Sequence, residues 1–588
     1  MESMEIDSER DGAKSWPDPG VPIEEGPEKS AEKPLTSEQV QNELGGYVFK
    51  VKDEIRLRRF LCLGIEKSIF HTGEVTLTLE NDICNCITRL ISEDGINVVK
   101  TIREFSVENR ACKSDYVLFA LALCCRCTDP ETKEAAYKAL PDVCRIPTHL
   151  FKFIKFAQEV NSKGKGWGRA HRKGVSMWYH SYKNKDGGIP LLAYHMTKYK
   201  ARFGFTHKDV FRLCHIKTDY NALGYLVHHF YRRNGHREDD WQNQFNLARQ
   251  NLTKHDELEL KNVIDLLQDV DDAKRCRDEQ LMKRIVLSRD VLKIVREHVP
   301  TSLLKSKEVW EGLMRFMLMT AMLRNLGRMS SFGLLDSDSF GETLTISKLK
   351  NSELLKGARI HPLTLLVAEK AYSKCRNNKG TIQWKENPNV RDALRDAFHL
   401  SFKNVEATGK RFLLAICMSD PENPHVNGTP SITALEAAAA MALVTRRSEK
   451  NCDIVAFSGI QSTEHPNITN FSISPEDDLD AVLDKCSKLP CAKTNIAAPI
   501  IHAFENKKMY DVFVVYTDSV NEDGSVHPSR ALKLYRTRSG NANARLIVCG
   551  LASNEFSIAD PEDPLMMDIV GFDSHAPTAI HQFVTGNI

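Results

Sequence analysis

The feature that most constrains the fold of this chain is a change in its hydrophobic pattern near residue 405. From about residue 46 to 404, apolar residues recur at spacings of three and four, as in KSKEVWEGLMRFMLMTAMLRNLG (305–327). That spacing is typical of amphipathic helices. After it, short apolar runs rich in β-branched residues, such as RFLLAICM and DVFVVYTD, alternate with helical stretches. The pattern predicts a helical domain over 46–404 and an α/β domain over 405–588.

Many helices of two to four turns, joined by short loops, favour a HEAT-like α-solenoid over a four-helix bundle in the first domain. Thr206, followed by Asp209 three residues later, resembles a capping box, and Ser306 precedes an apolar run that begins at Val309. Both patterns predict helix starts. Gly327 is placed to end a helix, because glycine readily adopts the left-handed conformation found there.

In the second domain, strands that alternate with helices predict a doubly wound parallel sheet that is covered on both faces. Ligands of such sheets bind at the carboxyl ends of the strands. The segment ATGKR (407–411) resembles a phosphate-binding loop in part only. It lacks the first glycine and the hydroxyl residue after lysine, so we expect no nucleotide-binding loop there.

Residues 1–45 contain twelve acidic residues, four basic residues and five prolines. Such a composition buries too little apolar surface to offset the entropy of ordering, so we expect a disordered acidic tail. The chain shows neither a secretory signal nor an apolar stretch near the roughly 18 residues of a membrane span. Its 16 cysteines lack framework spacing, so we expect a soluble intracellular protein with reduced thiols and no membrane partner.

The most informative segment runs from residue 145 to 217. It contains sixteen Lys or Arg residues against three acidic ones, together with six histidines and twelve aromatic residues, whereas the net charge of the whole chain is only +2. Cations neutralise phosphates and aromatic rings stack on unpaired bases, so the segment favours nucleic acid as the partner. The alternative is a solvated helix face above core aromatics, and we expect rings such as Trp178 and Tyr179 to be core residues.

Helical spacing within this segment suggests how its cations are presented. Lys198 and Arg202 are four residues apart, as are Lys208 and Arg212, so each pair would share one face of a helix. Two neighbouring helices would then present one cationic surface. By itself, His215 is better explained as a capping or packing residue than as an RNA contact.

These strings resemble the family of the sixty-kilodalton Ro autoantigen, the TROVE-domain family, and we expect an invertebrate-type member. The resemblance extends from about residue 46 to the C-terminus. The matching strings are RRFLCLG (58–64), LFALALCCRC (118–127), VCRIPTHLFKFI (143–154), WGRAHRK (167–173), TKYKARFGFTHKDVFRLCHIK (197–217), KSKEVW (305–310), LRNLGRM (323–329), ARIHP (358–362), TGKRFLLA (408–415), RLIVCG (545–550) and DIVGFD (568–573).

The resemblance implies a ring of HEAT-like repeats, followed by a von Willebrand factor A-like domain with a C-terminus that closes the ring. It implies RNA binding within small ribonucleoprotein particles, with Y RNA and misfolded small noncoding RNAs, such as defective 5S ribosomal RNA precursors, as partners. It also implies that a single-stranded 3′ end of the RNA passes through the ring, and that the protein acts in RNA quality control and stability. The resemblance also implies a cytoplasmic location, with the nucleus as a second compartment.

Within the basic segment, the expected RNA-binding residues are the cations and histidines of the matching strings and their neighbours. They are Arg145, Lys163, Lys165, Arg169, Arg172, Lys173, Lys198, Lys200, Arg202, His207, Lys208, Arg212, His215 and Lys217.

Domains of the von Willebrand factor A type usually hold a divalent cation through an Asp-x-Ser-x-Ser motif, a loop Thr and a further Asp. In this chain, Cys417 and Pro421 stand at the first Asp and second Ser positions, which leaves Ser419, Thr494 and Asp518 as candidate ligands. A thiol is a poor ligand for magnesium, which needs near-ideal octahedral oxygen coordination. We therefore expect a degenerate site that is weak or empty, holding magnesium weakly at most, and no other cofactor.

No nucleophile–base constellation can be read from the sequence, so we expect no catalytic residues and no enzyme activity. Two alternatives stay open: a protein-interaction scaffold without direct RNA readout, and an RNA-processing enzyme whose catalytic acids come from distant positions. In either case the A-like domain is expected to offer a surface for protein partners.

Overall fold

The computed structural model describes most of the chain in segments. These are residues 39–41, 47–49, 52–65, 69–72, 76–79, 82–161, 164, 166–231, 238–288, 292, 294–377, 380–418, 424–457, 468–474, 476–489, 495–518, 526–552, 558–560 and 563–588. Apart from residues 39–41, the expected acidic tail lies outside the described residues. The chain forms two compact units, one of residues 52–406 with 573–588 and one of residues 1–51 with 407–572.

The first unit is helical, as the spacing of its apolar residues predicted. Its α-helices are α1 Asp53–Leu63, α2 Asp82–Val107, α3 Ser114–Arg126, α4 Pro130–Val143, α5 Pro147–Glu159, α6 Gly168–His180, α7 Gly188–Lys198, α8 His207–Cys214, α9 Ala222–Tyr231, α10 Glu238–Arg249, α11 Lys254–Arg275, α12 Glu279–Leu287, α13 Lys307–Phe316, α14 Met319–Ser331, α15 Phe340–Leu349, α16 Ser352–Gly357, α17 Pro362–Ser373, α18 Pro388–Leu400 and α23 Ala576–Val584. Short elements join them, namely β3 Ile69–His71, η1 Ser181–Asn184, β4 Ala201–Arg202, β5 Phe205–Thr206, η2 Arg296–His298, η3 Leu303–Lys305 and η4 Ser401–Asn404.

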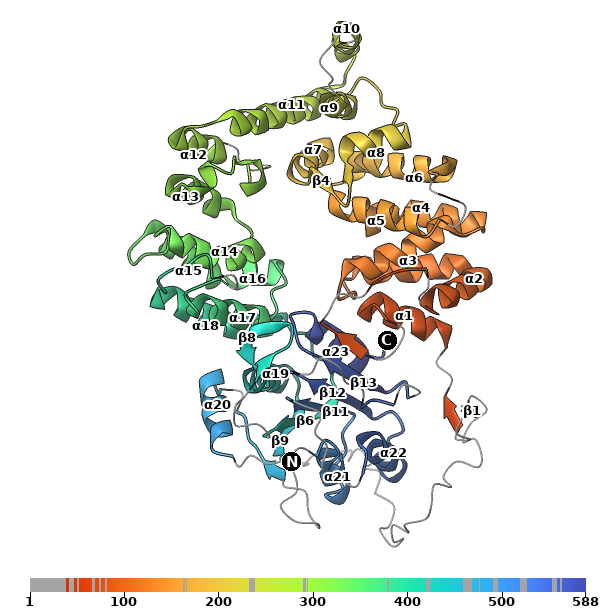
Figure 1. Cartoon of the computed structure of the whole chain (residues 1–588), viewed down its shortest axis with the longest axis vertical. Coiled ribbons are helices and arrows are strands. Elements are labelled where there is room, and N and C mark those ends of the chain that lie inside the picture. The colour runs from red at the N-terminus through yellow and green to blue at the C-terminus, as the bar shows by residue number, and fades with distance from the viewer. Residues whose placement is uncertain are drawn as a thin grey trace, which may run out of the picture. The chain divides into compact units, whose positions relative to one another are not determined.

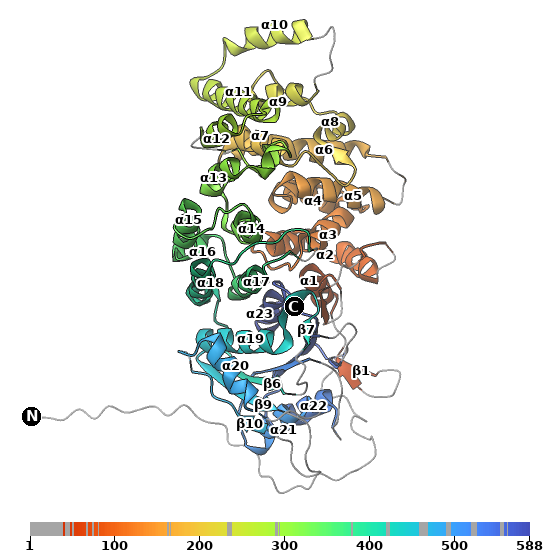
Figure 2. The same ribbon diagram turned by 60° about the vertical axis from the view of Figure 1, so that its left-hand side comes forward.

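Within this unit the helices stack in sequence order. Helices α1 to α8 follow one another along one column, and α12 to α18 follow one another along a second (Figures 1 and 2). Helix α11 contacts both α7 and α12, so it joins the two columns. Large aromatic side chains such as Trp178, Tyr179 and Trp310 are fully buried between the helices. This is the helical-repeat architecture that the sequence predicted.

Two predicted helix starts are confirmed at the level of hydrogen bonds. The Thr206 side chain accepts from the backbone N–H of Asp209, and the Asp209 carboxylate accepts from the backbone N–H of Thr206, which makes a capping box for α8. The Ser306 side chain accepts from the Val309 N–H at the start of α13.

Two other predictions about helices are wrong. Helix α14 continues through Gly327 to Ser331. Glycine is needed there for close packing, because a Cβ atom would meet the Trp384 ring at 2.6 Å. Lys198 and Arg202 do not share a helix face. Helix α7 ends at Lys198, and Arg202 lies in β4 of a short antiparallel hairpin with β5.

The second unit is an α/β domain with a mixed sheet. Its strands are β1 Gln39–Gln41, β2 Tyr47–Phe49, β6 Arg411–Cys417, β7 His425–Val426, β8 Thr429–Thr433, β9 Asn451–Phe457, β10 Ile468–Asn470, β11 Val512–Thr517, β12 Arg545–Gly550 and β13 Met566–Val570. Its helices are α19 Ala434–Ser448, α20 Leu479–Ser487, α21 Ala498–Glu505 and α22 Pro528–Ser539.

Six strands of this unit lie in the order β10-β9-β6-β11-β12-β13. Neighbours from β9 to β13 are parallel, and β10 is antiparallel to β9. All six residues of β11 are buried. Because successive side chains of a strand point to opposite faces, both faces of the sheet are covered there. None of the helices in the described residues is long and apolar enough to span a membrane.

Candidate nucleic-acid interface

Helices α6 and α8 carry the exposed cations at the centre of the basic segment. On α6, the residues Val175, Trp178 and Tyr179 are buried, so the cations at spacings of three and four turn to the opposite side. Arg169, Arg172 and Lys173 are accordingly exposed.

Helix α8 packs against α6. It adds Lys208, which is half-buried, and Arg212, which is exposed. The two packed helices therefore bring five cationic side chains onto neighbouring surfaces, as the helical spacing predicted for the α8 pair.

Most of these cations are not neutralised by carboxylates of the described part of the chain. No ion pair holds Arg169, Arg172 or Arg212 within the described ranges. The one carboxylate on α8, Asp209, accepts from the Thr206 hydroxyl at 2.6 Å and from its N–H at 3.0 Å. The hydrogen bond from the Thr206 side chain lowers the pKa of Asp209. Asp209 thus serves the helix start, and the surface around it stays positive.

The end of α7 and the start of the hairpin that follows it carry three further predicted residues. Lys198 is half-buried, with its Nζ 5.5 Å and 5.2 Å from the ring centroids of Tyr194 and Tyr199. Lys200 and Arg202 are exposed. Burial, together with the nearby ammonium group of Lys274, lowers the pKa of Lys200. Lys274 on α11, which itself pairs with Asp271 at 2.9 Å, therefore acts on Lys200 although it lies far outside the segment that the sequence singled out.

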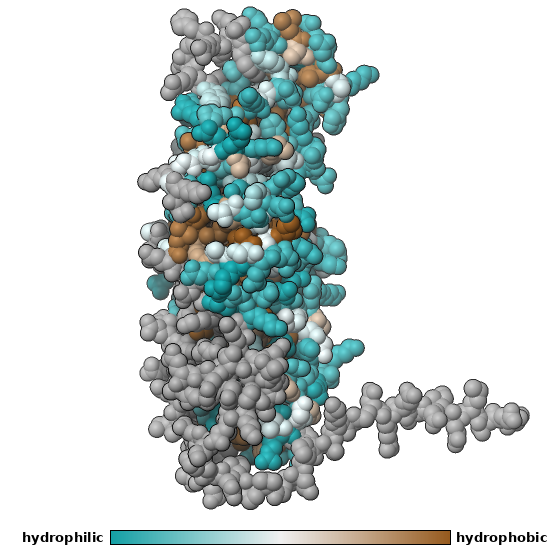
Figure 3. Space-filling model, turned by 90° about the vertical axis from the view of Figure 1, so that its right-hand side faces the viewer, coloured by the Kyte–Doolittle hydropathy of each residue, from teal (hydrophilic) through white to brown (hydrophobic). Residues whose placement is uncertain are grey.

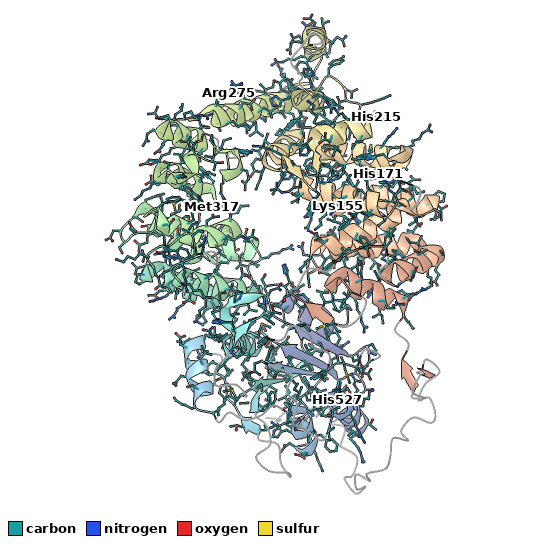
Figure 4. All side chains as sticks on the ribbon, viewed as in Figure 1. Lys155, His171, His215, Arg275, Met317 and His527 are labelled. Atoms are coloured by element: carbon teal, nitrogen blue, oxygen red, sulfur yellow. The ribbon has the colours of Figure 1, made fainter. Side chains whose placement is uncertain are left out.

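The other predicted residues fall at separate places. Arg145 is exposed between α4 and α5, and its guanidinium donates to the Asn109 side chain at 3.0 Å. His215, labelled in Figure 4, is the C-cap residue of α8. It has the left-handed conformation with φ 50°, and its backbone N–H donates to the Phe211 carbonyl oxygen, so the capping interpretation is confirmed. Lys217 is exposed just beyond it. Lys163 and Lys165 lie outside the described residues.

The prediction that His207 contacts RNA at the surface is wrong, because only 1% of the residue is exposed. Its Nδ1 lies 3.1 Å from the Tyr179 hydroxyl, and its ring packs on Phe151 and Phe211. Burial lowers the pKa of His207 to about 3. The side chain is therefore neutral and part of the core, where it cannot contact RNA.

A series of hydrogen-bonded tyrosine–histidine pairs, which helical spacing does not predict, stabilises the basic segment beneath its surface. Tyr137 bonds to His171 at 3.0 Å, Tyr179 to His207 at 3.1 Å, and Tyr182 to His195 at 3.0 Å. These pairs, with the fully buried Trp178, use up many of the histidines and aromatic rings of the segment. The prediction that Trp178 and Tyr179 are core residues is confirmed.

Among the residues that Figure 3 colours by hydropathy, hydrophilic ones predominate, and apolar ones gather in a band near mid-height and in a smaller group near the top. A hydrophilic surface with clustered cations suits a highly charged partner better than an apolar one.

In the α/β unit, two of the expected metal-site positions are described. Cys417 ends β6 and Asp518 follows β11, and these strands are parallel neighbours, so both residues lie at the same carboxyl edge of the sheet. Ser419, Pro421 and Thr494 lie outside the described residues. No group of three or more His, Cys, Asp or Glu residues suited to a metal ion occurs among the residues that the structure describes.

Backbone N–H groups of the segment ATGKR (407–411) are already hydrogen-bonded to a side chain of the same unit. The buried carboxylate of Glu449 accepts from the backbone N–H groups of Thr408 at 2.6 Å and of Gly409 at 3.0 Å. The N–H groups that a phosphate would need are therefore already bonded to this carboxylate.

A helical-repeat unit with a basic surface and an α/β unit with a mixed, mostly parallel sheet define a two-part protein with a von Willebrand factor A-like domain. The TROVE domain matches residues 40–377, and the Ro60 vWA domain matches residues 411–584. The chain therefore belongs to the Ro60 family of TROVE-domain proteins.

Known relatives cover nearly the whole chain. The chain is 33% identical to RNA-binding protein RO60 of Caenorhabditis elegans, over 94% of this chain and 90% of that protein. It is also 33% identical to RNA-binding protein RO60 of Deinococcus radiodurans, over 94% of this chain and 97% of that protein. The crystal structure of the Deinococcus radiodurans RO (RSR) protein matches with a TM-score of 0.76 and 31% identity, covering 91% of this chain and 100% of that one.

Proposed function

We propose that this chain is a non-enzymatic RNA-binding protein whose helical unit binds RNA through its basic surface. The observation that carries the proposal is the pair of packed helices α6 and α8, whose exposed cations Arg169, Arg172 and Arg212 lie free of ion pairs within the described part of the chain. Such cations bind phosphates and release counterions. The two relatives that are named RNA-binding proteins support the same function.

The finer part of the proposal concerns which RNAs bind. We propose Y RNA and misfolded small noncoding RNAs, such as defective 5S ribosomal RNA precursors, as partners within small ribonucleoprotein particles. The protein would act in quality control and stability of these RNAs in the cytoplasm, with the nucleus as a second compartment. Support comes from the family to which the chain belongs. Sequencing RNA that is crosslinked to the protein in cells tests these identities.

The surface itself is tested by the salt dependence of RNA binding. We expect the double variant Lys208→Ala/Arg212→Ala to bind a structured small RNA more weakly and to lower the slope of log affinity against log salt by about two units, one for each lost phosphate contact. The matched control is Lys138→Ala on α4, because that lysine is exposed but lies on neither α6 nor α8. It should leave the slope unchanged.

An unchanged slope in the double variant would remove α8 from the interface. If RNA failed to copurify with the wild-type protein while proteins did, the chain would be an interaction scaffold. Cleavage of bound RNA in magnesium would show an RNA-processing enzyme.

A further inference from the structure

The tip of the hairpin between β4 and β5 holds an aromatic residue in an unusual backbone conformation. Ala201 pairs with Thr206 and Arg202 with Phe205, which leaves Phe203 and Gly204 as a two-residue turn. Both turn residues have positive φ, 52° for Phe203 and 83° for Gly204. Turns of this kind favour asparagine, aspartate or glycine at both positions, and a bulky side chain there is an outlier.

Packing in the core does not explain this phenylalanine. The residue is 40% exposed, and the Lys152 ammonium of α5 lies 5.2 Å from the ring centroid. A residue kept in a strained conformation, with its ring open to solvent, points to a function rather than to folding.

Lys152 also lines a cavity of about 630 Å³. The cavity lies between the loop before α2, the first turn of α3 and one face of α5. It is lined by Thr76, Leu77, Thr78, Leu79, Lys113, Asp115, Tyr116, Lys152, Lys155, Phe156 and Glu159. Its volume falls within the range of roughly 300–1,000 Å³ that is usual for small-molecule sites.

The chemistry of the lining suits a phosphate beside a flat ring. Three ammonium groups, those of Lys113, Lys152 and Lys155, face two carboxylates. Lys152 pairs with Asp115, and Lys155 lies 3.7 Å from Glu159.

The side chains of Tyr116 and Phe156 supply an apolar wall. The Lys152 Nζ lies 5.8 Å from the Phe156 ring centroid, so this lysine stands between the ring in the cavity and the ring at the hairpin tip. Lys155 of helix α5 is labelled in Figure 4.

We infer that Phe203 and this cavity form one site for unpaired nucleotides. One base stacks on the exposed ring of Phe203, while the next nucleotide enters the cavity and its phosphate meets Lys152 and Lys155. The source of the nucleotide is either a single-stranded segment of RNA, in which case the inference rests on the proposed function, or a free mononucleotide. The site lies outside the cations of α6 and α8, so the two surfaces can be tested separately.

The first test replaces Phe203 with asparagine, which tolerates positive φ and removes the ring. We expect Phe203→Asn to be at least as stable to heat as the wild-type protein, yet to bind an unstructured oligouridine about tenfold more weakly, within the range expected for one lost stacked base. The matched control is Phe340→Asn on α15, because that residue is 49% exposed and has the Arg315 guanidinium 4.5 Å from its ring centroid. The control should bind oligouridine as the wild-type protein does.

The second test addresses the cavity with Lys155→Gln and with photocrosslinking of oligouridine that carries 4-thiouridine. We expect weaker binding of oligouridine by Lys155→Gln, and crosslinks on residues 76–79, 113–116 or 152–159. Uridine monophosphate alone, measured by calorimetry, distinguishes the two sources. Saturable binding that Lys155→Gln abolishes indicates a free nucleotide, and its absence beside intact oligouridine binding indicates RNA.

Wild-type affinity for oligouridine in both Phe203→Asn and Lys155→Gln would overturn the inference, as would crosslinks confined to α6 and α8. If polyglutamate displaced labelled oligouridine as well as unlabelled oligouridine does, the site would be a general anion site. That result would also overturn the inference. The α6 and α8 surface is judged separately, by binding of blunt structured RNA to the Lys208→Ala/Arg212→Ala variant. The two proposals can therefore fail independently.

Discussion

Several histidines of the helical unit are buried or half-buried, and burial keeps them neutral at pH 7. Burial lowers the pKa of His207 and of His298 to about 3, and that of His149 and of His195 to about 4. In the unfolded chain each would have a pKa near 6.5. Because the folded state resists protonation, these residues stabilise the fold fully above pH 6.5, and that stability is lost as the pH falls towards 3 to 4.

We therefore predict that the protein loses stability on acidification from pH 7.5 to 5, and that His207→Gln loses less than the wild-type protein. For one fully buried histidine with these pKa values, the difference is on the order of 2 kcal/mol at pH 5. Urea denaturation at both pH values measures it. If His207→Gln and the wild-type protein lost the same free energy of unfolding between pH 7.5 and 5, the prediction would be wrong.

At the scale of elements, the C-terminal end of α13 is held by a side chain from another helix. The Lys348 ammonium of α15 donates to the carbonyl oxygens of Met314 at 2.9 Å, Arg315 at 3.0 Å and Met317 at 3.1 Å. Burial lowers the pKa of Lys348. Carbonyl groups at a helix end lack partners within the helix, so this lysine satisfies groups that the sequence of α13 leaves open.

We predict that Lys348→Met lowers the free energy of unfolding by about 1–3 kcal/mol, the range for hydrogen bonds to a charged group. The matched control is Lys350→Met, whose exposed ammonium pairs with Asp396 at 3.0 Å and should contribute less than about 1 kcal/mol. Chemical denaturation of both variants measures the difference. Equal stability of the two variants would show that the three carbonyl groups are satisfied as well by water.

At the scale of the whole molecule, the expected threading of an RNA end predicts a preference for tails. A structured RNA with a free single-stranded 3′ end should bind more tightly than the same RNA made blunt, because each stacked base adds about 1–3 kcal/mol. Competition binding at fixed ionic strength compares the two RNAs. If both bind equally, only the α6 and α8 surface contributes.

The A-like domain supports a second prediction at this scale. With Cys417 at a carboxylate position and Pro421 at a hydroxyl position, the wild-type protein should show no rise in melting temperature at millimolar magnesium, because a ligand stabilises only in proportion to its occupancy. The double variant Cys417→Asp/Pro421→Ser should show such a rise. Binding of RNA should be indifferent to EDTA at fixed ionic strength, since the proposed contacts are cationic side chains. A magnesium-dependent rise in the wild-type protein would show that three oxygen ligands suffice.

The sequence by itself determined the order of the two kinds of domain, because hydrophobic spacing alone separates helices from buried strands. It also determined local features whose cause lies within a few residues, such as the capping box at Thr206. The segregation of charge between residues 145 and 217 likewise pointed to the basic surface of α6 and α8.

Only the tertiary structure decided which residues of that basic segment face solvent. His207 and Arg212 lie on the same short helix, yet the first is in the core and the second is exposed, because α8 packs one side on Tyr179 and Phe151. Tertiary packing likewise kept Gly327 inside a helix under the Trp384 ring and brought Lys274 next to Lys200. These outcomes depend on contacts between residues far apart in the chain, which helical spacing does not encode.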